Sequence, residues 1–578
     1  METQHIIRGR LIDIPRQKIY RAALTISDGI LTHIEPLPEE EPESAGNSGG
    51  TTDAPGTTGL PDTSGHNEPY ICPGFIDAHV HIESSMLVPS EFARLAVVHG
   101  TVATVSDPHE IANVCGIDGV KYMIANGKQV PFHFYFGAPS CVPATIFETA
   151  GASLGVAEVE ELLENPEIRY LSEMMNFPGV LSGDTDVLEK IAAARRLGKP
   201  VDGHAPGLRG AAAKSYIEAG ISTDHECFTE AEALEKLQYG MHILIREGSA
   251  AKNFDTLIGL LRDYPEKIMF CSDDKHPDSL VAGHINQLCA RAIAAGIPLF
   301  NVLQAACINP ARHYSLDVGQ LKVGDPADFI LLEDLREFKV RQTFINGQPV
   351  GDKGKSLIPS VPVLPINKFR SREISEQDLR YPLQKWGENE PENFEQVRVI
   401  EALDGQLITG KMEVPLSDLL VHDGVLESNP GKDILKIVVV NRYQTSAPVA
   451  KSFIRNFGLK GAAIASSVAH DSHNIIAVGT DDALLARAIG LLLEEKGGIS
   501  CVTEAEQRLL PLPIAGLMSA QDGYEVAREY TAIDQMAKDA GSKLSAPFMT
   551  LSFMALLVIP HLKLSDKGLF DGDSFNII

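Results

Sequence analysis

The spacing of apolar and polar positions divides the chain into three parts. Near the start, short apolar runs with polar neighbours (HIIRGRLIDI, IYRAALTISDG, ILTHIEPL) predict β-strands. From Tyr70 to about Asn309, apolar segments alternate with helix-like stretches such as DVLEKIAAARRLG. After about Asn367, helix and strand patterns mix, as in DALLARAIGLLLEEKGG and DILKIVVVNRY. The middle part therefore has the pattern of repeated βαβ units.

The middle part contains eight apolar segments, and each of them ends in polar or charged residues. They are YICPGFIDAHVH, TVATVSDPH, PFHFYFGAPS, IRYLSEMMN, KPVDGHAPG, GISTDHE, MHILIREGS and KIMFCSDD. Eight strand–helix repeats over about 240 residues match the size of a (β/α)₈ barrel, whose active face lies at the strand C-termini. We therefore predict an α/β fold with a (β/α)₈ TIM-like barrel over residues 71–316.

Two smaller domains are predicted around this barrel. After it, LKVGDPADFILLEDLREFKVRQTFINGQPV has strand-like runs and an Asn-Gly hairpin signal. We expect residues 317–365 to pair with residues 1–70 in a small β-sandwich domain made from both flanks. Residues 39–67 are rich in Gly, Ser, Thr and Pro and predict a flexible loop. Residues 366–578 are predicted to form an additional C-terminal α+β domain.

Six side chains at the predicted strand ends are of metal-ligand types. His79 and His81 end the first strand two residues apart, so both point to one face. The other four strand-end candidates are Glu173, His204, His225 and Asp273. An isolated His-x-His pair is common without a metal, but six nitrogen or oxygen donors on one face of a barrel predict a metal site.

The types of ligand limit the chemistry of such a site. Histidine and carboxylate without thiolate suit Zn, Fe, Mn or Co. More ligands are present than one four-coordinate ion needs, so we predict two ions with Glu173 between them. A metal lowers the pKa of bound water from ~15.7 toward ~7. Asp273 could then take the proton as general base, which predicts hydrolysis of a C–N or C–O bond.

Composition limits the classes of molecule that the protein can bind and the compartment in which it works. The 578-residue chain has a formal net charge of −27, which disfavours nucleic acid and leaves a neutral or cationic small substrate. Its 8 cysteines contain no C-x-x-C pair and are typical of a reducing cytoplasm. METQHIIRGRL has no signal-peptide pattern, and PFMTLSFMALLVIP is too short to span a bilayer. We therefore expect a cytoplasmic protein without a membrane or nucleic-acid partner.

Several motifs resemble one enzyme family. PGFIDAHVHIESS followed by TVATVSDPHEIANVCG is similar to the amidohydrolase superfamily and, within it, to the adenine deaminases. The more specific motifs are SDPHEIANVCG, SEMMNFPGV, DGHAPG, TDHE and CSDDKHP, with SSVAHDSHNIIAVG and IPHLKLSDKGLFD near the C-terminus. The resemblance covers nearly the whole chain. Many superfamily members carry a carbamylated lysine on strand four, where this chain has Glu173, as in adenine deaminases.

The resemblance implies a reaction and a cofactor. The substrate would be adenine, which water converts to hypoxanthine and ammonia by attack at C6, with Asp273 as the proton acceptor. The cofactor would be two divalent ions, Mn²⁺ or Fe²⁺, with Zn²⁺ as a further option. We expect a purine-salvage enzyme that forms a homo-oligomer, a dimer or larger.

Two polar stretches leave more than one interpretation. In Asp107-Pro108-His109-Glu110, His109 and Glu110 could act with Asp273 and His225 as catalytic residues and protonate a ring nitrogen or the leaving amine. Alternatively, Pro108 ends the strand and the next two residues cap a helix. The stretch His470-Asp471-Ser472-His473 is either a polar turn between two strands or a part of the C-terminal domain that contributes to or closes the active site.

Three other functions are weighed against the deaminase. A cyclic-amide hydrolase of the hydantoinase or dihydroorotase kind is the main alternative, although Glu173 and the Asp-Pro-His-Glu stretch argue against it. A non-catalytic scaffold would be expected to lose ligands, and every ligand position is filled. The cytidine type of zinc deaminase needs a P-C-x-x-C motif that the sequence lacks.

Overall fold

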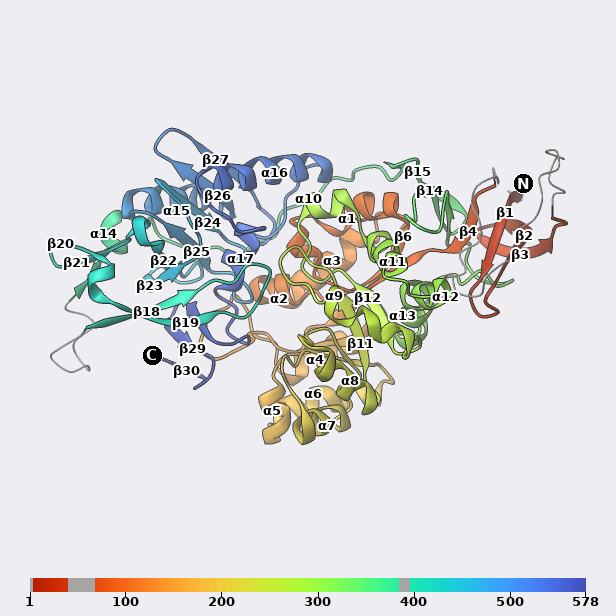
Figure 1. Ribbon diagram of the computed structural model, residues 1–578, viewed down its shortest axis with the longest axis horizontal. Coiled ribbons are helices and arrows are strands. Elements are labelled where there is room, and N and C mark those ends of the chain that lie inside the picture. The colour runs from red at the N-terminus through yellow and green to blue at the C-terminus, as the bar shows by residue number, and fades with distance from the viewer. Residues whose placement is uncertain (1–3, 40–67, 384–394) are drawn as a thin grey trace, which may run out of the picture.

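The computed structural model describes residues 4–39, 68–383 and 395–578 of the chain. Figure 1 shows an elongated molecule with a small β-sheet at one end, a barrel in the middle and a sheet-rich C-terminal domain at the other end. The loop predicted at 39–67 lies, from residue 40 onward, outside the described residues.

The small sheet is built from both flanks of the barrel. Its order is β16-β15-β14-β13-β4-β1-β2-β3. The strands are β1 (Gln4–Asp13), β2 (Lys18–Ser27), β3 (Ile30–Pro36), β4 (Tyr70–Pro73), β13 (Phe329–Leu332), β14 (Val340–Ile345), β15 (Gln348–Asp352) and β16 (Lys355–Ser356). Strand β4 joins the two flanks, because Ile71 pairs with Leu11 of β1 in parallel and with Leu331 of β13 in antiparallel orientation. All three side chains are buried in one apolar cluster.

Eight parallel strands form the barrel within the fully described stretch 68–383. They are β5 (Phe75–Val80), β6 (Thr101–Ser106), β7 (His133–Ala138), β8 (Ile168–Met174), β9 (Val201–Gly203), β10 (Thr223–Asp224), β11 (His242–Arg246) and β12 (Ile268–Cys271). Ser222 N donates to Val201 O at 2.9 Å between β9 and β10. Asp273 N donates to His79 O at 2.9 Å, which brings β12 back to β5 and closes the ring. The predicted α/β fold with a TIM-like barrel is confirmed.

Helices connect the barrel strands and cover their outer surface. They are α1 (Pro89–Ala96), α2 (His109–Cys115), α3 (Ile117–Gly127), α4 (Val156–Glu164), α5 (Phe177–Ser182), α6 (Thr185–Arg196), α7 (Gly210–Glu218), α8 (Glu230–Gln238), α9 (Phe254–Leu257), α10 (Pro277–Ala282), α11 (Ile285–Ala294), α12 (Leu299–Leu303) and α13 (Asn309–His313). Side-chain caps fix where several begin: Asp184 accepts from Val187 N at α6, and Thr229 accepts from Glu232 N at α8.

The C-terminal domain has another eight-stranded sheet, of order β19-β18-β23-β22-β25-β24-β26-β27. Its strands are β18 (Gln396–Glu401), β19 (Gly410–Pro415), β22 (Ile434–Val440), β23 (Ala450–Arg455), β24 (Ala462–Ser466), β25 (Ile475–Gly479), β26 (Gly498–Thr503) and β27 (Gln507–Pro511). The smaller strands are β17 (Tyr381–Pro382), β20 (Leu420–His422), β21 (Val425–Glu427), β28 (Leu562–Ser565), β29 (Gly568–Asp571) and β30 (Asn576–Ile577). The helices are α14 (Glu376–Leu379), α15 (Asp482–Glu495), α16 (Gly523–Asp539) and α17 (Pro547–Phe553). This domain supplies the additional sheet-rich unit that the sequence predicts.

The C-terminal domain packs directly on the barrel. Arg94 Nη1 of α1 lies 2.6 Å from Asp522 Oδ2, and Glu91 Oε2 accepts from Gly523 N at 2.8 Å. One continuous apolar cluster runs from Val80 in the barrel to Phe548 in α17. The two units therefore share a core, and this fixes the C-terminal domain over the barrel mouth.

Within the described ranges, no helix has the length and hydropathy of a membrane span.

Candidate metal centre and active site

The end of β5 places its polar side chains in two layers. Asp77 lies below the mouth, where its carboxylate accepts from Ser272 N at 2.9 Å and lies 2.8 Å from His284 Nε2. His79 and His81 lie above it, with their Nε2 atoms 3.1 Å apart. His81 Nδ1 lies 3.2 Å from Asp107 O; a carbonyl only accepts, so Nδ1 carries the proton and Nε2 carries a lone pair. The predicted same-face placement of the two histidines holds in the structure.

Asp273 faces this histidine pair from the end of β12. Its Oδ1 lies 3.4 Å from His81 Nε2 and 3.8 Å from His79 Nε2. Asp273 has a φ of +54°, in the left-handed region that Asp tolerates better than most residues. This local turn follows β12 directly, and it lets the backbone of Asp273 bond to β5 while its carboxylate points to the mouth.

Glu173 at the end of β8 faces two separate groups of donors. Its Oε1 lies 3.5 Å from His81 Nε2. Its Oε2 lies 2.8 Å from His204 Nδ1 and 3.2 Å from His225 Nε2. The His225 ring also stacks on His79, with ring centroids 4.2 Å apart. All six residues that the sequence nominated as ligands therefore meet at one place, and each is between 0% and 5% exposed.

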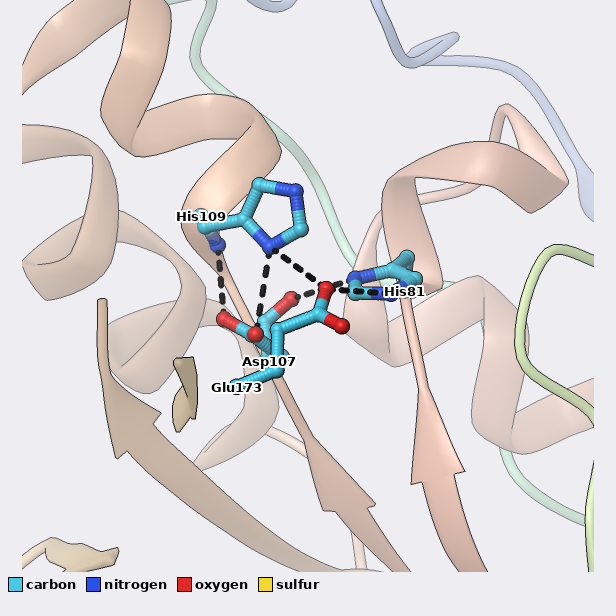
Figure 2. A group of neighbouring side chains, drawn as sticks. All are labelled: His81, Asp107, His109 and Glu173. Atoms are coloured by element: carbon cyan, nitrogen blue, oxygen red, sulfur yellow. Dashed lines mark hydrogen bonds and ion pairs between the residues drawn. The ribbon is translucent and has the colours of Figure 1, made fainter. Parts of the chain in front are cut away.

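Asp107 and His109, which follow β6, lie beside Glu173 of β8 (Figure 2). His109 Nδ1 lies 3.1 Å from Asp107 Oδ2 and 3.5 Å from Glu173 Oε1. Neither ring nitrogen of His109 has a hydrogen bond of good geometry. His109 and Glu110 also form the first turn of α2. The helix-start interpretation of this stretch is therefore correct, and it does not exclude the catalytic one.

A buried arginine organises the charges below the mouth. Arg246 Nη1 lies 2.6 Å from Asp273 Oδ2, and Arg246 Nη2 lies 2.9 Å from Glu226 Oε2. Burial by itself raises the pKa of Asp273, but Arg246 and neighbouring histidines outweigh it and hold this pKa well below its usual range. Burial lowers the pKa of His79 well below its usual value, and the nearby His225 and His81 act in the same direction. Asp273 is thus ionised and His79 neutral, the forms that bind metal. Burial lowers the pKa of His81, His204 and His225 as well, but nearby carboxylates outweigh it and raise the pKa of all three.

A buried lysine supports the two histidines that follow β9 and β10. Lys236 Nζ of α8 donates to Ala205 O at 2.8 Å and lies 2.6 Å from Asp224 Oδ2. Ala205 follows His204 in the chain, and Asp224 precedes His225. The lysine therefore ties the ends of two strands to one helix and limits the movement of both imidazoles.

The C-terminal domain forms the opposite wall of the site. A small cavity over the ligands is lined by His470, Asp471, Leu407 and Leu556 from this domain, together with barrel residues. Asp471 Oδ1 lies 3.6 Å from His109 Nε2, and Asp471 Oδ2 is buried without a hydrogen bond. The His-Asp-Ser-His stretch therefore lies at the site, which favours the second of the two interpretations of it.

Sequence reasoning missed several residues of this site. Asp107 and Glu226 lie inside quoted motifs, next to residues that were nominated, so the polar run at each strand end was an available signal. Arg246 at the end of β11 carried the same signal. Leu407 and Leu556 lie in the C-terminal domain, and no pattern distinguished them from ordinary core residues.

The donor set fits divalent metal ions. Ligand atoms about 2.0–2.1 Å from one tetrahedral ion lie ~3.3 Å apart, close to the His79–His81 and His81–Asp273 separations. His204 Nε2 and His79 Nδ1 are buried without hydrogen bonds. Groups of His, Asp and Glu whose ligand atoms lie within 4.8 Å of one another include His79–His225–Asp273 and Glu173–His204–His225. These two groups, with Glu173 also facing His81, form adjacent candidate sites.

Two family models together, and each of two relatives, cover most of this chain. The amidohydrolase family model matches residues 70–350, and the adenine deaminase C-terminal domain model matches residues 406–576. The chain is 54% identical over 573 residues to an adenine deaminase of Sulfurovum sp. (strain NBC37-1), covering 99% of each chain. It is 50% identical over 579 residues to an adenine deaminase of Salinibacter ruber, covering 100% of this chain and 99% of the relative. A solved β-aspartyl dipeptidase from Fervidobacterium islandicum is 17% identical, with a TM-score of 0.44, and covers 61% of this chain and 98% of its own.

Proposed function

The chain belongs to the adenine deaminase family of amidohydrolases, and from this premise we infer how its site converts adenine and water to hypoxanthine and ammonia. The observation that carries the inference is the position of Glu173, whose two carboxylate oxygens face two different groups of nitrogen donors. We propose that these groups hold two divalent ions, Mn²⁺ or Fe²⁺, with Zn²⁺ as the alternative.

We propose that His79, His81 and Asp273 hold one ion, that His204 and His225 hold the other, and that Glu173 bridges them. Divalent ions bound there would supply Lewis-acid polarisation and a water molecule of lowered pKa. The protein itself has to orient the purine and move protons. In the overall reaction the oxygen of water replaces the amine at C6, and the two water protons end on the released ammonia and on a ring nitrogen.

Asp273 is the proposed general base. Its Oδ2 is engaged by Arg246, while its Oδ1 faces the mouth of the barrel. A carboxylate with one fixed and one available oxygen can accept a proton from the attacking water without losing its orientation. His225 lines the same cavity, and we propose that it also contacts the reacting atoms.

His109 and Glu110 are the proposed partners in proton transfer on the amine side. Both nitrogens of His109 are free of well-formed hydrogen bonds, so the imidazole can contact the substrate directly. Glu110 Oε1 lies 3.4 Å from His109 Nε2. We expect His109→Ala to lower turnover far more than metal content. Turnover near that of the wild type would make the Asp-Pro-His-Glu turn purely structural.

The assay that tests the whole function is ammonia release from adenine by protein loaded with Mn²⁺, Fe²⁺ or Zn²⁺. Adenosine, cytosine and dihydroorotate serve as parallel substrates under the same conditions. We expect release from adenine and little from the others, with the Mn²⁺ or Fe²⁺ protein most active. Turnover of dihydroorotate without release from adenine would leave the metal site standing and reject the deaminase assignment.

The cellular setting is part of the same proposal. We propose a role in purine salvage in the cytoplasm. All eight cysteines are free and buried in the structure, which agrees with a reducing compartment. The expected homo-oligomer stays a prediction, and light scattering of the purified protein would measure it.

A further inference from the structure

Two histidines of the C-terminal domain bond to one carboxylate of the barrel. His470 Nδ1 lies 2.5 Å from Glu110 Oε1, and His473 Nε2 bonds to Glu110 Oε2. The histidines are 360 and 363 positions away from Glu110 in the chain. All three side chains are at most 2% exposed. Both oxygens of Glu110 are therefore engaged by another domain.

The local turn fixes His473 as a hydrogen-bond donor. Ala469 N lies 3.2 Å from His473 Nδ1, and a backbone amide can only donate. Nδ1 must then carry the lone pair, so the ring proton is on Nε2 and points to Glu110 Oε2. The turn is closed by His473 N donating to Ala469 O at 2.7 Å. The backbone of the C-terminal domain thus sets the tautomer that meets the barrel carboxylate.

The distances favour direct hydrogen bonds over a third metal ion. Two ligand atoms on one tetrahedral ion lie ~3.3 Å apart, as His79 and His81 do at 3.1 Å. The contact of His470 with Glu110, at 2.5 Å, is much shorter than that separation, so the two atoms meet directly with no ion between them. A carboxylate held by two donors has lost its freedom to rotate, and its Oε1 lies 3.4 Å from His109 Nε2.

We propose that His470 and His473 are positioning residues that hold the Glu110 carboxylate beside His109, so that the C-terminal domain completes the proton-transfer side of the active site. The inference rests on the proposed function, in which His109 and Glu110 transfer protons. The turn also carries Asp471, whose Oδ1 lies 3.6 Å from His109 Nε2. One turn of the C-terminal domain therefore contacts both members of the His109–Glu110 pair.

The test compares two substitutions of His473. His473→Asn tolerates the left-handed backbone at this position (φ +53°) and can still accept from Ala469 N, but it is too short to reach Glu110. His473→Gln can place an amide donor near the position of Nε2. We expect His473→Asn to lower kcat for adenine about 10- to 100-fold, with KM and metal content per chain unchanged, and His473→Gln to recover most of kcat.

A double-mutant cycle shows whether the effect passes through Glu110. In the Glu110→Gln background, His473→Asn should change kcat by less than about twofold, because the carboxylate that it orients is already absent. His561→Asn is the matched control: His561 Nδ1 lies 2.5 Å from Asp573 Oδ1 in an exposed pair of the same domain. This control should leave kcat unchanged.

Several results would overturn the proposal. They are wild-type kcat in His473→Asn, loss of metal in that variant, or effects of His473→Asn and Glu110→Gln that multiply in the double mutant. If His473→Asn does not fold, His470→Leu removes the other donor and serves in the same cycle. Failure of the proposed function is seen separately, because the wild-type protein would then release no ammonia from adenine. Full turnover in Glu110→Gln would overturn the positioning proposal and the proton-transfer role of Glu110, and it would leave the deaminase assignment intact.

Discussion

The two walls of the active site are built on different principles. The barrel wall is charged, and two of its proposed metal ligands are held by further contacts, with Asp107 O behind His81 and Arg246 behind Asp273. The wall from the C-terminal domain presents two leucines and one turn with His470 and Asp471. A purine has flat apolar faces and a polar edge. The C-terminal wall therefore suits contact with the faces of the ring, and the barrel wall suits the reaction at its edge.

The difference indicates that residues for substrate binding and residues for the chemistry lie on different walls of the site. In the proposed function, the barrel wall holds the metal ions. The C-terminal residues that line the same cavity would then contact the substrate. Substitutions in the barrel wall should then change metal content, and substitutions in the other wall should change KM or kcat with the metal retained.

The largest effect is expected at the barrel wall. His79→Asn should remove metal and lower turnover by on the order of 10³-fold or more, beyond the 10- to 100-fold typical of residues that only support a ligand. Metal analysis and ammonia release measure the two effects. His242→Asn is the control, because His242 begins β11 at the opposite end of the barrel. Normal metal content in His79→Asn would show that this histidine is not a ligand.

A smaller effect is expected at the C-terminal wall. Leu407→Ala and Leu556→Ala should each raise KM for adenine by about 10-fold, because apolar contact with the ring is lost while the metal ligands are intact. Steady-state kinetics with metal analysis would separate these effects. Leu364→Ala, at a side chain that is 82% exposed, should change nothing. A change in metal content in the cavity variants would remove the distinction between the two walls.

The smallest effect is expected at Glu148, a buried barrel residue near Asp471 of the C-terminal domain. Burial raises the pKa of Glu148 from 4.5 to about 8, and the nearby Asp471 adds to this. A raised carboxyl pKa contributes stability that is full below the unfolded pKa and is lost as pH rises through about 8. Glu148→Gln should therefore gain a few degrees in Tm relative to the wild type at pH 9 but not at pH 5.

Thermal unfolding measured across this pH range tests the predicted effect of Glu148 on Tm. Glu164→Gln on the exposed side of α4 is the control, and its Tm should follow the wild type at every pH. Equal Tm differences between Glu148→Gln and the wild type at pH 5 and pH 9 would show that Glu148 does not titrate in this window.

The two walls also differ in how far the sequence predicts them. In a parallel barrel all strands end on one face, so a His or Glu at a strand end is placed by topology alone. That is why His79, Glu173 and His204 could be nominated without a structure. Leu407 and Leu556 reach the site only because two domains dock, and docking depends on the fit of side chains that have no period in the sequence. The turn at His470 was open to two interpretations for the same reason.

The fold of the small sheet was also predictable only in part. Apolar alternation and the Asn-Gly signal identify its strands, but the order of the strands depends on β4, which pairs with strands from both flanks. A strand of four residues carries little periodic signal. Its pairing with β13 follows from where the barrel starts and ends, and this is a property of the whole chain.

That pairing has a consequence for the time course of synthesis. Residue 71 of β4 pairs with residue 331 of β13, so β4 waits for 260 further residues before its second neighbour exists. At translation rates of roughly 5–20 residues per second, the wait lasts on the order of 15–50 seconds. During this interval the emerging chain carries an open strand edge, which is a template for pairing with another chain. Neighbouring ribosomes on one messenger RNA bring such open edges of nascent chains close together, and this favours misassembly by strand pairing between chains.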